Sequence, residues 1–118
     1  MTQPITDTLT PIRDADWQAV PGLPGIYVMN LYDTLDETAR TGRRTRLVKF
    51  DAGAESDRQL SHEYHEEVYL ISGDMYGFRE AAGFGSFDVQ AYVHRAPGTL
   101  HAPIGSKTGC VMLEIHYF

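Results

Sequence analysis

The segment HEYHEEVYLISGD, residues 62–74, places two imidazoles and three carboxylates just before a run of strand-forming residues. Val, Tyr, Leu and Ile favour strands, and Gly followed by Asp commonly ends them. On a helix His62 and Glu66 would share a face, but the strand-forming run and its early stop favour a polar turn followed by a strand. We therefore predict a strand at 68–72 that forms a hairpin through residues 72–74 with a second strand at 75–79.

The same pattern extends outward along the chain. Short runs of strand formers are separated by Gly, Pro and Asp turns, and no long amphipathic helix interrupts them. In the last run, Val111, Leu113, Ile115 and Tyr117 share one face, while Glu114, His116 and Phe118 share the other. The predicted strands outside the central segment are 26–32, 45–50, 87–95 and 109–118. Several short strands at this spacing indicate an all-β barrel or sandwich.

The chain has 118 residues, of which 42% are hydrophobic, so it can fill the core of one domain. Its first 25 residues carry four prolines and two glycines, which predicts an extended N-terminal arm anchored by Trp17 and Val20. We expect two parts, the arm at 1–25 and a β-barrel domain at 26–118.

Composition disfavours several classes of protein. The net charge of −6, with Lys49 and Lys107 as the only lysines, disfavours binding to nucleic acid. No apolar run is long enough to cross a membrane, and residues 1–10 lack the features of a signal peptide. The single cysteine, Cys110, fits a reducing compartment, so we expect a cytoplasmic protein with no membrane partner.

The histidines and carboxylates of residues 62–67 are candidate metal ligands. Imidazole nitrogen and carboxylate oxygen suit borderline divalent metals. On a straight strand His62 and Glu66 would lie about 13 Å apart at roughly 3.3 Å per residue, so shared binding requires a bend between them. His101 follows a Pro97-Gly98 turn that redirects the chain, which makes it a further candidate.

Together these two segments resemble the two motifs of the cupin family. Gly73 and Glu66 match the glycine and glutamate of the first motif, and His62 matches its second histidine. Gly98 and His101 match the second motif, with its proline displaced by one residue. The resemblance covers about residues 26–118 and extends to small single-domain cupins similar to anti-sigma factors and acetylacetone dioxygenases.

The resemblance implies a single-domain cupin-type jelly-roll β-barrel that holds one divalent metal through His62, Glu66 and His101. Iron(II) is the favoured ion, with manganese, nickel or zinc as alternatives. Leu60 stands where the family has its first motif histidine, so His65 is a candidate replacement ligand. Glu67 could take the place of Glu66 by a slip of one residue. Glu66 and Tyr64 are the candidate catalytic residues.

The resemblance further implies a small-molecule enzyme, first of all a non-haem iron dioxygenase acting on an enolisable oxygenated compound such as a diketone. A redox-neutral metal-dependent isomerase or lyase, a non-catalytic metal- or ligand-binding cupin, and a metal-free remnant are the alternatives. We expect a homodimer, because strands 26–32 or 109–118 would expose unpaired edges. His94 and His116 are predicted to be structural or surface residues. The candidate pocket residues are Tyr64, Tyr69, Tyr76, Phe78, Phe87, Tyr92, Met112 and Glu114.

Overall fold

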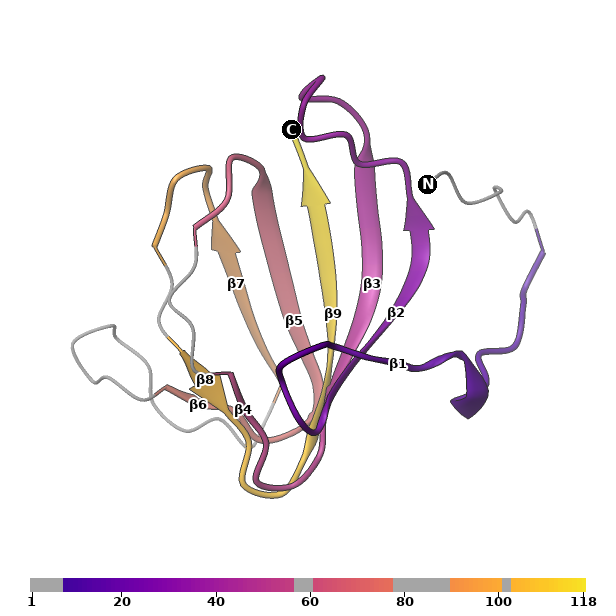
Figure 1. The fold of residues 1–118 in the computed structure, drawn as a ribbon, viewed down its shortest axis with the longest axis vertical. Coiled ribbons are helices and arrows are strands. Elements are labelled where there is room, and N and C mark those ends of the chain that lie inside the picture. The colour runs from indigo at the N-terminus through magenta and orange to yellow at the C-terminus, as the bar shows by residue number, and fades with distance from the viewer. Residues whose placement is uncertain (1–7, 57–60, 78–89, 101–102) are drawn as a thin grey trace.

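Two antiparallel sheets form the domain in the computed structural model, which describes residues 8–56, 61–77, 90–100 and 103–118 (Figure 1). The larger sheet has the strand order β1-β2-β3-β9-β5-β7 and the smaller one β4-β8-β6. The strands of the larger sheet are β1 (Gln18–Ala19), β2 (Ile26–Asp33), β3 (Arg43–Phe50), β5 (His65–Gly73), β7 (Ala91–Arg95) and β9 (Cys110–Tyr117). Those of the smaller sheet are β4 (Glu55–Ser56), β6 (Tyr76–Gly77) and β8 (Ile104–Gly105). The all-β jelly-roll prediction is confirmed.

The predicted hairpin through residues 72–74 is wrong. β5 pairs with β9 and β7, whereas β6 pairs with β8 in the other sheet, so the chain changes sheets after Gly73. Gly73 has a φ of +84°, and a Cβ there would lie 1.9 Å from the Gly109 carbonyl oxygen. The close approach of two backbones therefore requires glycine at this crossing.

The carboxylate of Asp74 holds the turn at residues 106–109 beside this crossing. It accepts hydrogen bonds from the Ser106 and Thr108 hydroxyls at 3.0 and 2.6 Å, and from the Lys107 and Thr108 amides at 3.0 and 2.8 Å. The Thr108 hydroxyl, followed by the two amides, keeps the pKa of Asp74 well below its usual range. The link ties the end of β5 to the start of β9.

The last strand is central, not an edge as predicted. β9 lies between β3 and β5, with Phe50 opposite Cys110 and Leu70 opposite Met112. β2, the other predicted edge, is partly covered by the short strand β1. Within the described residues, β1 and β7 are the outer strands of the larger sheet.

The inward faces of β3, β5, β7 and β9 change from apolar to charged along their length. At one end they contribute to a buried apolar cluster of Ile26, Val48, Phe50, Ala54, Val68, Leu70, Met75, Cys110 and Met112. At the other end the same faces carry Arg44, Arg46, Glu66, Arg95, Glu114 and His116. Because the strands are in register, these charged positions meet.

The residues before β2 run along the larger sheet. A short 3-10 turn, η1 (Asp14–Asp16), precedes β1, and the Lys49 ammonium lies 4.9 Å from the Trp17 ring centroid. Val20 and Leu23 pack against the apolar cluster. No helix in the described part of the chain is long and apolar enough to span a membrane.

We expect Asp74→Asn to lower the free energy of unfolding by about 2 kcal/mol, because an amide nitrogen would face a backbone N–H in place of a charged acceptor. Urea denaturation measures the loss, and exposed Asp14→Asn is the control for charge. Since the pKa of Asp74 is lowered by folding, its contribution is present above about pH 4 and fades below it. Equal stability of the two variants at pH 7 would contradict this role.

Candidate functional site

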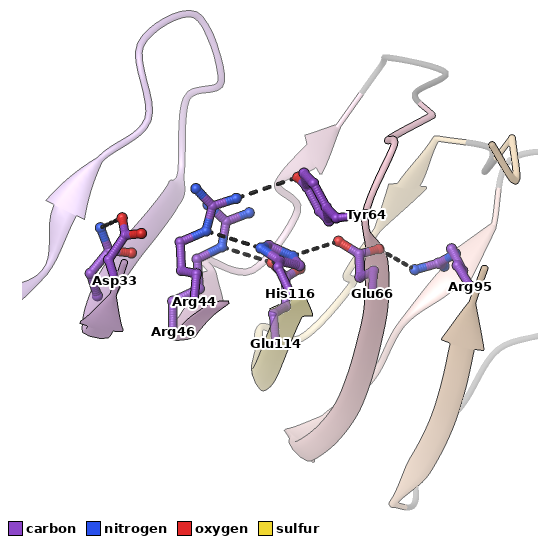
Figure 2. A network of polar contacts seen from close by, with 9 residues as sticks. Asp33, Arg44, Arg46, Tyr64, Glu66, Arg95, Glu114 and His116 are labelled. Atoms are coloured by element: carbon purple, nitrogen blue, oxygen red, sulfur yellow. Dashed lines mark hydrogen bonds and ion pairs between the residues drawn. The ribbon is translucent and has the colours of Figure 1, made fainter. Parts of the chain in front are cut away.

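Four side chains form a hydrogen-bonded row across four neighbouring strands (Figure 2). Arg44, His116, Glu66 and Arg95 occupy directly paired positions on β3, β9, β5 and β7. Arg44 Nε donates to His116 Nδ1 at 3.0 Å, His116 Nε2 lies 2.9 Å from Glu66 Oε2, and Arg95 Nη1 donates to Glu66 Oε1 at 2.9 Å. The register of the sheet thus places an imidazole and a carboxylate between two guanidinium groups.

The adjacent pair on β3 and β9 adds a second carboxylate. Arg46 Nε donates to Glu114 Oε1 at 2.8 Å, and that oxygen also lies 3.5 Å from His116 Nε2. The Glu66 and Glu114 side chains are only 5% and 12% exposed. His116 therefore faces two buried carboxylates, each of which is paired with an arginine.

Both carboxylates are held in their charged form. Burial alone would raise the pKa of Glu66. The hydrogen bond from His116 and the charge of Arg95 have the larger combined effect, so the pKa lies below its usual value. Burial acts in the same way on Glu114, and His116 and Arg46 outweigh it, so that its pKa falls to about 2. The site consequently offers two anionic oxygen ligands at neutral pH.

The donor set fits a divalent metal in type and reach. Ligand atoms of Glu66, Glu114 and His116 all lie within 4.8 Å of one another. One imidazole nitrogen and two carboxylate oxygens suit iron(II), manganese or zinc. Arg95 fixes the orientation of Glu66 through the oxygen that does not face His116, as outer hydrogen bonds do at metal sites.

Arg44 opposes a metal at His116. A guanidinium can only donate, so the bond from Arg44 requires a lone pair on His116 Nδ1 and assigns the ring proton to Nε2. A metal at Nε2 would need the opposite tautomer, whose Nδ1 proton would face the Arg44 donor. Binding an ion at Nε2 therefore requires Arg44 to move aside.

The predicted residues His62 and Tyr64 lie beside this cluster. The His62 ring stacks on Tyr64 at 4.6 Å between centroids and lies 6.3 Å from the His116 ring. Burial, as the largest effect, lowers the pKa of His62 and keeps it neutral at pH 7. The Tyr64 hydroxyl accepts a hydrogen bond from Arg44 Nη2 at 3.3 Å, so Tyr64 helps to orient the arginine that bonds His116.

His65 and Glu67, the predicted alternative ligands, do not lie with Glu66. His65 lies on the opposite face of β5, where it stacks on Tyr117 and its Nδ1 lies 3.0 Å from His94 Nε2. Glu67 shares that outer face and accepts from the Tyr92 hydroxyl. His101 lies outside the described residues. The Gly98 amide donates to the His62 carbonyl at 2.7 Å, which brings the Pro97-Gly98 turn beside His62.

A cavity of about 860 Å³ opens in front of the cluster. Among the described residues, its charged lining consists of Arg46, Glu66, Arg95 and Glu114, and His62 borders it as well. Most of the remaining wall is apolar and includes Val68, Leu70 and Met112 from the sheet and Val20 and Leu23 from the segment before β2. The cavity thus joins a charged end to an apolar interior, as small-molecule sites do.

His116 is the central residue that sequence reasoning missed, since it was predicted to be structural or surface. Two signals pointed to it. Glu114 and His116 alternate on the same face of β9, and Arg44 and Arg46 alternate in the same way on β3. Charged residues repeated at this period on an inward face indicate a polar site.

The sequence matches the family described as the ChrR cupin-like domain over residues 6–117. The chain belongs to this family. No curated protein matches the sequence. The resemblance to cupins is therefore confirmed at the level of the family, and the match includes most of the N-terminal arm.

Solved structures support the same cupin fold at low sequence identity. The acetylacetone dioxygenase from Acinetobacter johnsonii has a TM-score of 0.71 at 18% identity, covering 98% of this cupin and 76% of that chain. KdgF from Halomonas sp. has a TM-score of 0.66 at 22% identity, with coverages of 89% and 90%. A chain in the complex of Rhodobacter sphaeroides SigE with the anti-sigma ChrR has a TM-score of 0.61 at 16% identity, with coverages of 87% and 50%.

We expect Arg44→Met to raise the affinity for Mn(II) or Zn(II) about tenfold or more, because it frees the His116 tautomer and removes a nearby positive charge. Titration calorimetry of chelator-treated protein measures the change. Arg43→Met, which removes an exposed arginine from the outer face of the same strand, should leave the affinity unchanged. An Arg44→Met affinity equal to or below that of the unaltered protein would refute the competition.

Proposed function

We propose that this cupin is a metal-dependent small-molecule enzyme. The observation that carries the proposal is the convergence of Glu66, Glu114 and His116 at the wall of a cavity large enough for a small organic molecule. These three residues would hold the ion, with His62 as a further ligand or proton acceptor at the cavity edge. His101 stays a predicted ligand.

The reaction we favour is oxygen-dependent cleavage of an enolisable oxygenated compound such as a diketone, with iron(II) as the ion. A bound divalent ion supplies Lewis-acid stabilisation of an enolate oxygen and, as iron(II), a site for dioxygen chemistry. The likeness to an acetylacetone dioxygenase supports this choice over a redox-neutral isomerase or lyase.

The residues of the chain itself supply binding and proton transfer. Neutral His62 can accept the proton released on enolisation at a ring nitrogen, because its lowered pKa keeps that nitrogen unprotonated at pH 7. Arg95 holds Oε1 of Glu66 in a fixed position and leaves Oε2 for the ion. The apolar walls around Val68, Leu70 and Met112 exclude water from the reacting end.

The same proposal includes a homodimer in the cytoplasm. Among the described residues β7 is an outer strand and carries exposed Tyr92, so a second copy that pairs or packs along it would cover this edge. Sedimentation equilibrium measures the assembly, and a monomer at micromolar concentration would remove the dimer from the proposal without affecting the metal site.

Glu114→Gln and His116→Gln should each weaken iron(II) or manganese(II) binding by at least about tenfold, because each removes a ligand and leaves its neighbours imperfectly paired. Anaerobic titration and metal analysis of protein purified without chelator measure the loss. Glu67→Gln and His94→Gln on the outer face are the matched controls. Unchanged affinity in both inner variants would exclude this cluster as the metal site.

Oxygen consumption with the iron-loaded protein tests the reaction separately. A panel of β-diketones should stimulate uptake in the unaltered protein, and the inner variants should lose it. Stoichiometric metal binding without any stimulated uptake would remove the dioxygenase assignment and leave the isomerase, lyase or binding alternatives.

A further inference from the structure

We infer that the charged end of the cavity binds the carboxylate of a monoanionic ligand whose apolar body fills the interior, with Arg46 as the residue that selects the anion. The inference names the ligand class of the site proposed above and rests on that proposal for the identity of the cavity. It is carried by the shielded position of Arg46, by its hydrogen bonding and by the lining of the cavity.

The charges that line the described part of the cavity are paired. Arg46 bonds Glu114 and Arg95 bonds Glu66, and the two arginine side chains are only 26% and 10% exposed. Arg44 on β3 lies opposite Asp33 on β2. Because a guanidinium has five donors, a shielded arginine that uses one of them on a carboxylate can still bind a second anionic partner.

Arg46 is the arginine with donors left for that partner. Its Nε bonds Glu114, and among the described residues no hydrogen bond occupies its terminal Nη groups. The side chain borders the cavity, so these donors are accessible from inside it. A guanidinium fork matches a carboxylate with two parallel hydrogen bonds, which an alcohol or an ammonium group cannot reproduce.

The rest of the cavity selects an apolar body. Away from the charged end the wall is built mainly from aliphatic side chains and Phe50, including Ile26, Val28 and Ile104. The volume of about 860 Å³ accommodates a ligand of some ten carbon atoms or a small aromatic acid. The two ends together fit an alkyl or aryl monocarboxylate better than a sugar or a nucleotide, because the described lining away from the charged end is mostly apolar.

Titration calorimetry with decanoate, decan-1-ol and decylamine below their micelle concentrations tests the inference. We expect chelator-treated protein to bind decanoate at least about tenfold more tightly than either neutral or cationic analogue, as charge-assisted hydrogen bonds are strong in a shielded site. Equal binding of decanoate and decan-1-ol would overturn it.

Substitutions in β3 test whether Arg46 causes the preference for decanoate. Arg46→Gln should reduce decanoate affinity about tenfold and leave decan-1-ol unaffected, whereas Arg43→Gln, on the exposed outer face of β3, should change neither. Arg46→Lys keeps the charge but not the guanidinium fork. It should weaken the binding of decanoate, which should still bind more tightly than decylamine. If Arg46→Gln does not fold, as judged by circular dichroism, the lysine variant decides: undiminished decanoate affinity there would overturn the role of the fork.

The same titrations separate this inference from the proposed enzyme. Anion selectivity without metal binding would refute the metal-dependent function and leave the carboxylate site standing. Metal binding and diketone-stimulated oxygen uptake without anion selectivity would refute the carboxylate site and leave the metal-dependent function standing.

Discussion

The register of β3, β9, β5 and β7 determines what this cupin can do. Because Arg44, His116, Glu66 and Arg95 occupy paired positions, four side chains with complementary donors and acceptors meet in one row. A slip of one residue in β9 would turn Glu114 and His116 to the outer face and bring Ile115 and Tyr117 inward. The apolar half of the same strands prevents that slip, since Cys110 and Met112 would leave the core with them. Packing at one end of the sheet therefore secures the chemistry at the other.

The sequence was sufficient for the fold class, and of the three clustered residues it singled out Glu66 as a candidate ligand and Glu114 as a pocket residue. Alternation and turn residues predicted strands close to β2, β3, β5 and β9. The spacing of His62 and Glu66 before Gly73 matched the first cupin motif. The change of sheets after Gly73 was missed because a glycine–aspartate turn looks the same whether the next strand pairs back or crosses over. His116 was missed because its role depends on which face of β9 points inward, and that depends on the partners of β9 on both sides. Such non-local pairing cannot be read from a single strand, although the matching alternation of Arg44 and Arg46 with Glu114 and His116 was a usable signal.

Arginine pairing distinguishes this cluster from a site built for a metal alone. At metal centres the second nitrogen of a ligating histidine ordinarily donates to a carboxylate or a carbonyl. Here His116 Nδ1 accepts from Arg44, and both carboxylates have guanidinium partners. The arrangement stabilises the folded wall without any ion, because every fully buried side-chain donor and acceptor among the described residues has a partner. An incoming ion must then compete with interactions that already satisfy its ligands.

Metal and anion binding should consequently support each other. A divalent ion beside Glu66 and Glu114 would meet the same arginines that attract an anion, and two unit charges 5 Å apart repel by about 3 kcal/mol at an effective dielectric of 20. A carboxylate on Arg46 offsets that repulsion, so each ligand should raise the affinity for the other by the same factor. In such a system the arginines would disfavour an ion in the empty cavity and favour it once the acid has entered. The row across the four strands would then couple occupancy of the cavity to assembly of the reactive centre.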